Sequence, residues 1–165
     1  MAKTYTGSGI NPEGKLAATN PKSISLAIAA RCWQCVGGGA DPAAVEQIKK
    51  CTIGDCALYP VRPYQAHGFK ANIEVLRRSA PVLPPGKVAS PIDRARANPS
   101  SRALAVRACC YDCMGGQPVG RPNPNGNVKK HVGECATIRC ALWDARPWKA
   151  GVSDDTREER ETENA

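Results

Sequence analysis

The chain is poor in aromatic residues for its length. Its 165 residues include one phenylalanine, and aromatic residues make up only 5% of the composition. So few rings cannot fill the core of a large domain, and modules of about 45 residues usually need a staple such as a metal ion or disulfides. The composition therefore predicts one or two small domains held together by such a staple.

Long apolar runs are also missing. The longest is the short stretch 26–30, whereas a transmembrane helix needs about 20 apolar residues. Residues 1–12 contain no apolar run after Lys3, so a secretory signal peptide is not predicted. We therefore expect no membrane partner and a cytoplasmic location, in which cysteine thiols remain reduced.

Cysteine, by contrast, is abundant, and eight of the nine cysteines form two sets with one layout. Each set has a pair separated by two residues, a spacer of 15 or 21 residues, and a pair separated by four. Two such loops can bring four thiolates to one tetrahedral zinc ion. The sequence therefore predicts two zinc ions. Their ligands are Cys32, Cys35, Cys51 and Cys56 in the first set, and Cys110, Cys113, Cys135 and Cys140 in the second.

The residues around the cysteines repeat as well. A Gly-Gly pair follows each Cys-x-x-Cys after one residue, at Gly37 and Gly115, and residues 56–64 match residues 140–148. The matched segments share Cys-Ala-Leu-aromatic, then Arg-Pro-aromatic. A duplication with a six-residue insertion in the second spacer explains this pattern. We expect the glycines to permit a tight turn with positive φ around the metal.

Two other uses of the eight cysteines remain open at this stage. Disulfides would suit a secreted protein, and an iron-sulfur cluster would also take four cysteines, although the usual ferredoxin spacing is missing. Cys109 is the odd cysteine, and we expect a partly buried thiol that ligates nothing because its neighbour Cys110 already does. His67 and His131 are interpreted as solvated surface residues.

The predicted fold is small, metal-stabilised and mainly α-helical, with irregular loops. It consists of two tandem zinc-finger-like modules joined by a proline-rich linker. Ser23, and Ser100 or Ser101, are predicted to cap the helices that carry the first cysteines, and Asp41-Pro42 to start another. Residues 71–78 suggest a short helix packed on the first module. The expected divisions are a flexible arm (1–22), module 1 (23–65), the linker (66–99), module 2 (100–150) and an acidic disordered tail (151–165).

Charge is distributed unevenly along the chain. The formal net charge is +8, composed of +12 for residues 1–150 and −4 for the tail. Four thiolates and one zinc ion carry −2, so two sites would lower the total to about +4. A surface with spaced Lys and Arg is typical of phosphate binding, and nucleic acid is the expected partner. The acidic tail could compete for that surface.

The repeated Arg-Pro-aromatic element supplies candidate contact residues. Arginine and flat rings together can bind phosphate and stack on bases. The candidates are Arg62 and Tyr64 in one repeat, and Arg146 and Trp148 in the other. In the alternative interpretation, the rings cover the thiolate cluster as core and the arginines neutralise it, which we favour for the leucines and for the first aromatics, Tyr59 and Trp143.

The whole pattern, from Cys-x-x-Cys-x-Gly-Gly to Cys-x4-Cys-Ala-Leu-aromatic-x-x-Arg, resembles the cysteine-rich module of small, mostly uncharacterised zinc-binding proteins of tailed bacteriophages and prophages. The likeness covers residues 26–64 and 104–148. Such modules commonly have proline after the last cysteine, where this chain has Ala57 and Ala141. The resemblance implies a phage-encoded protein acting in the bacterial cytoplasm, and it implies no established activity.

Three functions are consistent with these features. The leading hypothesis is a non-enzymatic tandem zinc-finger protein that binds nucleic acid or a nucleic-acid machine. The second is an adaptor that binds a host or phage protein through its aromatic face and proline-rich linker. The third is a nuclease or its accessory subunit. A sealed four-cysteine site leaves zinc no open position for water, so an enzyme is the less favoured interpretation.

Overall fold

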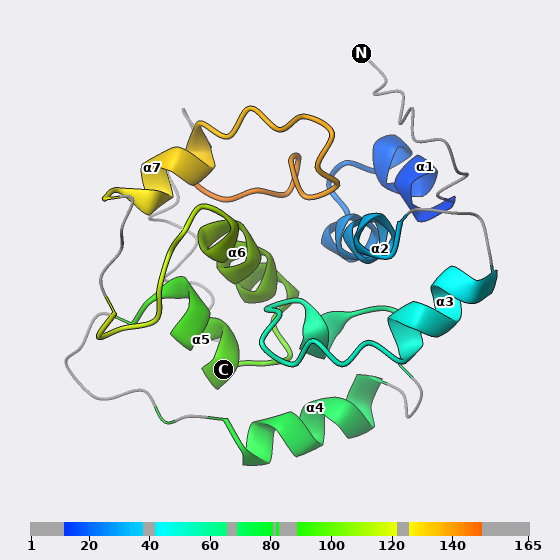
Figure 1. The fold of residues 1–165 in the computed structure, drawn as a ribbon, viewed down its shortest axis with the longest axis horizontal. Coiled ribbons are helices and arrows are strands. Elements are labelled where there is room, and N and C mark those ends of the chain that lie inside the picture. The colour runs from blue at the N-terminus through cyan, green and yellow to red at the C-terminus, as the bar shows by residue number, and fades with distance from the viewer. Residues whose placement is uncertain are drawn as a thin grey trace.

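The computed structural model describes residues 12–37, 42–65, 69–80, 82, 89–121 and 126–149. These residues form helices and irregular loops and contain no strand, which confirms the mainly α-helical prediction. Figure 1 shows the arrangement. The helices are α1 (Pro12–Thr19), α2 (Ile24–Cys35), α3 (Pro42–Lys49), α4 (Phe69–Arg78), α5 (Pro91–Ala97), α6 (Arg102–Cys113) and α7 (Val128–Gly133), and a 3-10 turn, η1, spans Tyr59–Val61.

Helices α2 and α6 carry the first cysteines of the two repeats, and they begin in the same way. Ser23 Oγ accepts a hydrogen bond from the N–H of Leu26 at 3.4 Å, and Ser101 Oγ accepts one from Leu104 at 3.3 Å. Each cap satisfies a backbone donor that the first helical turn leaves without a partner. The predicted cap at Ser23 is confirmed, and Ser101 rather than Ser100 caps α6. The predicted cap of α3, Asp41, lies outside the described residues.

Helix α1 lies within the segment predicted to be a flexible arm, and residues 1–11 lie outside the description. Helix α5 similarly lies within the predicted linker, as does α4. Helices α1 and α5 are equivalent, because each precedes an Asn-Pro pair, at Asn20 and Asn98, and a capping serine. The duplicated unit is therefore longer than the cysteine pattern indicates, and it begins at α1 and α5.

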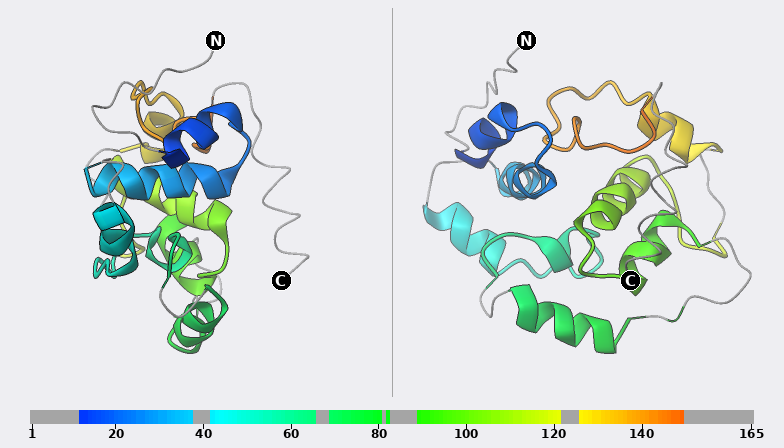
Figure 2. Two further views of the ribbon diagram at one scale, coloured as in Figure 1. Left: turned by 90° about the vertical axis from the view of Figure 1, so that its right-hand side faces the viewer. Right: turned by 180° about the vertical axis from the view of Figure 1, so that it is seen from behind.

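The two repeats pack through the same elements. Helix α1 lies against α2, and α5 lies against α6, while α2 and α6 also contact each other. The left view of Figure 2 shows α2 and α6 lying one above the other. The loop that follows Cys135 runs beside α1 and α2 of the other repeat in Figure 1.

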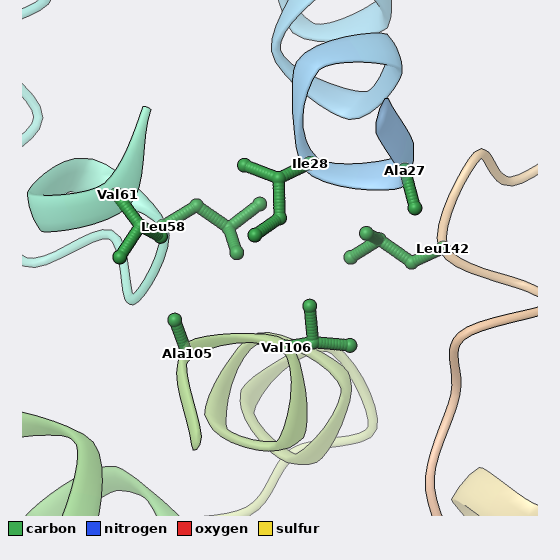
Figure 3. Close-up of a cluster of buried hydrophobic side chains, with 7 residues drawn as sticks. All are labelled: Ala27, Ile28, Leu58, Val61, Ala105, Val106 and Leu142. Carbon is green, nitrogen blue, oxygen red and sulfur yellow. The ribbon is translucent and has the colours of Figure 1, made fainter. Parts of the chain in front are cut away.

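One buried cluster contains residues from both repeats (Figure 3). Its members form equivalent pairs: Ala27 with Ala105, Ile28 with Val106, and Leu58 with Leu142, joined by Val61. A surface that packs on its own copy is the arrangement of a two-fold dimer. The two repeats therefore share this central cluster, while the cluster of Trp33, Ala44 and Ile48 belongs to the first repeat alone.

Two smaller clusters also combine residues from both repeats. Ala141 of the second repeat packs with Ala17 and Ala30 of the first. Conversely, Ala57 of the first repeat packs on the cluster that contains Ala95 and Ala108 of the second. The loop after the last cysteine of each repeat thus covers the helix pair of the other repeat, and small alanine side chains allow that close approach.

Helix α4 packs against η1, as predicted for a short helix in this region. Its Ile73 is buried, whereas Val75 is 66% exposed. Across the described residues, no helix has the length and apolar character that crossing a membrane requires.

Candidate metal centre

Each predicted ligand set combines two elements. Cys32 and Cys35 lie in the last turn of α2, and Cys51 and Cys56 flank the loop that follows α3. Residues three apart lie on the same face of a helix, so both helical thiols can face this loop. Cys110 and Cys113 occupy the same positions on α6, and Cys135 and Cys140 follow α7.

The four thiols of the first set lie close enough to affect one another's ionisation. Burial raises the pKa of Cys32 to about 12, and Cys56, Cys35 and Cys51 add to the increase, while Arg62 opposes it. Burial also raises the pKa of Cys56, against N–H donation to its sulfur from Leu58 and Tyr59. Both shifts oppose ionisation of Cys32 and Cys56, so a bound cation would have to displace their protons.

The second set lines a cavity of about 320 Å³. Burial raises the pKa of Cys110 to about 12, and the thiols of Cys140, Cys113 and Cys135 add to the increase. All four of these cysteines line the cavity, together with the cations Arg31, Arg139 and Arg146. The structure thus brings together the four residues that spacing alone had grouped.

The thiols do not form a ready-made ion site as they stand. Among the described residues, no group of three or more His, Cys, Asp or Glu side chains has the spacing to hold a metal ion. All nine cysteines belong to the described part of the chain, and all nine are free thiols. The disulfide alternative therefore finds no pair in this structure, and ion binding would require the side chains to turn toward a common centre.

The predicted glycine turns are present after both helices. Gly37 has φ of 93° and Gly115 has φ of 84°, a region that side chains other than glycine rarely adopt. Gly116 is required for a different reason, because a Cβ there would lie 2.2 Å from the Tyr111 ring. Gly38 lies outside the described residues.

Arg62 and Arg146, predicted as contact residues, fold back onto their own repeats. The guanidinium of Arg62 lies 3.9 Å from the ring centroid of Tyr59, and that of Arg146 lies 4.1 Å from that of Trp143. Each Nη1 donates to the carbonyl of the same aromatic residue, at 2.7 Å and 2.6 Å. Each Nε is buried and has no hydrogen-bond partner among the described residues. A buried donor without an acceptor is costly, so both positions suit a nearby anion.

Tyr64 and Trp148, the other predicted contact residues, are half-buried and share an unusual backbone. Their φ values are 59° and 55°, in the left-handed region that residues with side chains seldom occupy. Tyr64 packs on the cluster of Trp33 and Ile48, and Trp148 makes an edge-to-face contact with Tyr111 at 6.4 Å. Both rings thus close the core of their own repeat, and Trp148 in addition lines a second cavity.

Residues from the opposite repeat surround the second thiol set, and spacing gave no indication of them. Gln34 Nε2 donates to the carbonyl of Arg139 at 2.8 Å, and Gln34 Oε1 accepts from the N–H of Ala141 at 3.1 Å. These bonds hold the backbone on both sides of Cys140. The charge of Arg31 favours the ionised form of Cys110, although burial has the larger effect and the pKa of Cys110 is raised.

Cys109 occupies the position equivalent to Arg31 and is partly buried, as predicted. Burial raises its pKa, and the thiols of Cys110 and of Cys56 in the first repeat add to the increase. It thus lies beside the thiol set of the opposite repeat, as Arg31 does. His131 is exposed on α7, and His67 lies outside the described residues.

Comparisons of the chain with protein-family models, with curated protein sequences and with solved structures give no match.

Proposed function

We propose that the protein is a non-enzymatic, zinc-stabilised protein that binds nucleic acid. In this proposal the first four-cysteine set holds one zinc ion and the second holds another. Zinc supplies structural stability, because binding to four thiolates in a small fold contributes about 10 to 16 kcal/mol of apparent binding free energy. Four thiolates would also fill the tetrahedral coordination sphere and leave no position for substrate.

The buried Nε atoms of Arg62 and Arg146 are the observation that carries the metal proposal. Arg62 acts on the ionisation of Cys32, and Arg146 lines the cavity of the second thiol set. A zinc ion with four thiolates has a net charge of −2, which is the kind of anion that these guanidinium groups lack. The same unpaired Nε occurs at both equivalent arginines. An accidental placement of a single side chain would not be repeated in this way.

Charge supports nucleic acid as the partner. Residues 1–150 carry +12, and two occupied sites would leave about +8 on that part of the chain. Because Arg62 and Arg146 serve the thiol sets in this proposal, the phosphate contacts come from other basic side chains. Phosphate neutralisation by such side chains makes binding fall steeply with salt concentration.

The metal is tested by elemental analysis and free-thiol titration of protein purified from zinc-supplemented medium without chelator. Two zinc ions per chain are expected, together with one thiol outside the sites, Cys109, which reacts slowly because burial raises its pKa. A chain without metal, or one with iron and visible absorbance, contradicts the proposal.

Binding is tested by titrating labelled oligonucleotides at several salt concentrations. We expect the logarithm of the binding constant to fall linearly with the logarithm of salt concentration. Absence of binding would remove nucleic acid as the partner, and tight binding of a protein that is insensitive to salt would favour the adaptor function.

A further inference from the structure

A second cavity, separate from the thiol sets, lies beside α5, α6 and α7 and has a volume of about 220 Å³. It is smaller than the roughly 300 to 1,000 Å³ of pockets that hold drug-sized ligands. It suits a small group such as a phosphate with part of its sugar. Four cationic side chains line it: Arg94, Arg107, Arg121 and Lys129.

Among the described residues, no carboxylate lines the cavity, although one lies nearby. The carboxylate of Asp93 accepts hydrogen bonds from the Ser90 hydroxyl at 2.6 Å and from the N–H of Val119 at 2.8 Å. It also accepts from the N–H of Ser90 at 3.3 Å. These bonds fix the loop at Val119 against the start of α5 and hold two segments of the cavity wall in place.

The first repeat shows that the fold does not need these cations. The positions equivalent to Arg94, Arg107 and Lys129 are occupied there by Leu16, Ala29 and Val45. Arg107 is only 8% exposed, so α6 has an arginine at a buried position where the equivalent helix α2 has an alanine. The fourth cation, Arg121, lies in the longer spacer of the second repeat.

Two aromatic residues complete the wall of the cavity. Tyr111 and Trp148 both line it, and Lys129 Nζ lies 5.5 Å from the Trp148 ring centroid. The left-handed backbone at Trp148 sets the ring in this position. Rings next to cations are the combination that binds a nucleotide, because the cations neutralise phosphate and a ring can stack on a base.

We propose that this cavity of the second repeat binds a phosphate group of a nucleotide within a single-stranded nucleic acid. The inference rests on the proposed function, since it places one nucleic-acid contact on the chain. Arg94, Arg107 and Lys129 neutralise the phosphate. Arg121 closes the side of the cavity that the longer spacer forms, and Trp148 lies beside the adjoining base. The first repeat, which has apolar residues at the equivalent positions, binds no phosphate at this place.

The test compares two double variants of the full-length, metal-loaded protein that lose the same charge. Arg94→Leu with Lys129→Val installs the first repeat's residues in the cavity. Arg96→Leu with Lys130→Val changes neighbours on the same two helices that do not line it. Binding of labelled oligothymidylate is measured over a salt series, and binding of thymidine monophosphate and inorganic phosphate by calorimetry. Circular dichroism checks that both variants are folded.

We expect the cavity variant to bind oligothymidylate about tenfold more weakly, with a log-log salt slope reduced by about 2, and the control to retain the slope. Equal effects of the two variants would overturn the cavity proposal and leave the proposed function standing. If the wild type binds only the monophosphate or phosphate, and the cavity variant loses that binding, the proposed function fails and the cavity is a site for free anions. No binding of any of the three probes overturns both.

Discussion

Gly115 and Gly116 are adjacent in the turn after α6, but glycine is needed at each for a different reason. Gly115 needs its positive φ, whereas a Cβ on Gly116 would lie 2.2 Å from Cδ1 of the Tyr111 ring. That ring is 7% exposed, so it has little space to move away. We expect Gly116→Ala to lower the free energy of unfolding by about 1 to 3 kcal/mol.

Gly54→Ala is the matched control in chemical denaturation. A Cβ at Gly54 meets nothing within 4 Å. We expect it to be neutral or to stabilise by up to about 1 kcal/mol, because alanine restricts the unfolded chain. Equal effects of the two substitutions would mean that the contact with Tyr111 does not determine the choice of glycine.

A second prediction at the scale of single residues concerns the effect of Arg62 and Arg146 on metal affinity. If their buried Nε atoms serve zinc-thiolate sites, Arg146→Met should weaken the second site and leave the first unchanged. Changing a residue that contacts the metal ligands without binding the metal itself costs about tenfold to a hundredfold in metal affinity. With a chromophoric chelator in excess, we expect one ion per chain to leave faster and the other to leave at the wild-type rate.

Arg62→Met is the counterpart for the first site and should also accelerate one ion of the two. The variant with both substitutions should release both ions quickly. Unchanged release in all three variants would show that the guanidinium groups do not act on a bound metal.

At the scale of elements, Gln34 at the end of α2 holds the cysteine loop of the other repeat. Its amide makes one hydrogen bond to each side of Cys140, through Arg139 and Ala141. We expect Gln34→Ala to lower the free energy of unfolding by about 1 to 3 kcal/mol, because two hydrogen bonds are lost. The equivalent residue of the second repeat is the exposed Asp112, and Asp112→Ala should change stability by less than about 0.5 kcal/mol. Chemical denaturation of both variants measures these free energies of unfolding. Similar losses of stability in the two variants would contradict the role of Gln34.

The same bond favours alanine over proline after the last cysteine of the second repeat. Proline at position 141 would have no N–H to donate to Gln34, and its ring would replace an alanine packed on Ala17 and Ala30. Alanine after the last cysteine therefore fits the way in which each loop covers the opposite repeat. Ala57 packs on the second repeat in the equivalent manner.

The sequence predicted the helices that nearby residues stabilise, and it missed those that depend on packing against distant elements. The start of α2 was predictable because Ser23 caps a helix three residues away. Helices α1 and α5 were missed because Ala17 and Ala95 gain stability from burial against the other elements, and an alanine face gives little periodic signal. The repeated Asn-Pro before each capping serine, at Asn20 and Asn98, could have revealed them.

Some residues of the candidate site could likewise be predicted from local sequence, and others could not. Spacing was sufficient to indicate which cysteines lie near one another, since each set comes from two short segments, and their role as zinc ligands stays a prediction. Gln34 and Arg31 contact residues more than 70 positions away in the chain, and only the packing of α2 on α6 brings them to the second thiol set. No pattern within one repeat could identify residues contributed by the other repeat.

For the whole molecule, the shared core predicts that the two repeats unfold together. Leu58 and Leu142 are equivalent, each is 2% exposed, and both belong to the central cluster of Figure 3. Truncation of a buried leucine to alanine costs about 2 to 5 kcal/mol. Because the two side chains belong to one cluster, we expect the effects of Leu58→Ala and Leu142→Ala to be non-additive, with an interaction energy of about 0.5 to 3 kcal/mol.

Tryptophan fluorescence can follow each repeat separately, since Trp33 belongs to the first and Trp143 and Trp148 belong to the second. With the tryptophans of one repeat replaced by phenylalanine, the remaining signal reports the other. Leu58→Ala should shift the denaturation midpoint reported from the second repeat as much as that from the first, because both halves contribute side chains to the central cluster. Two separate transitions, with only the first repeat's midpoint shifted, would instead show that the two repeats unfold as independent units.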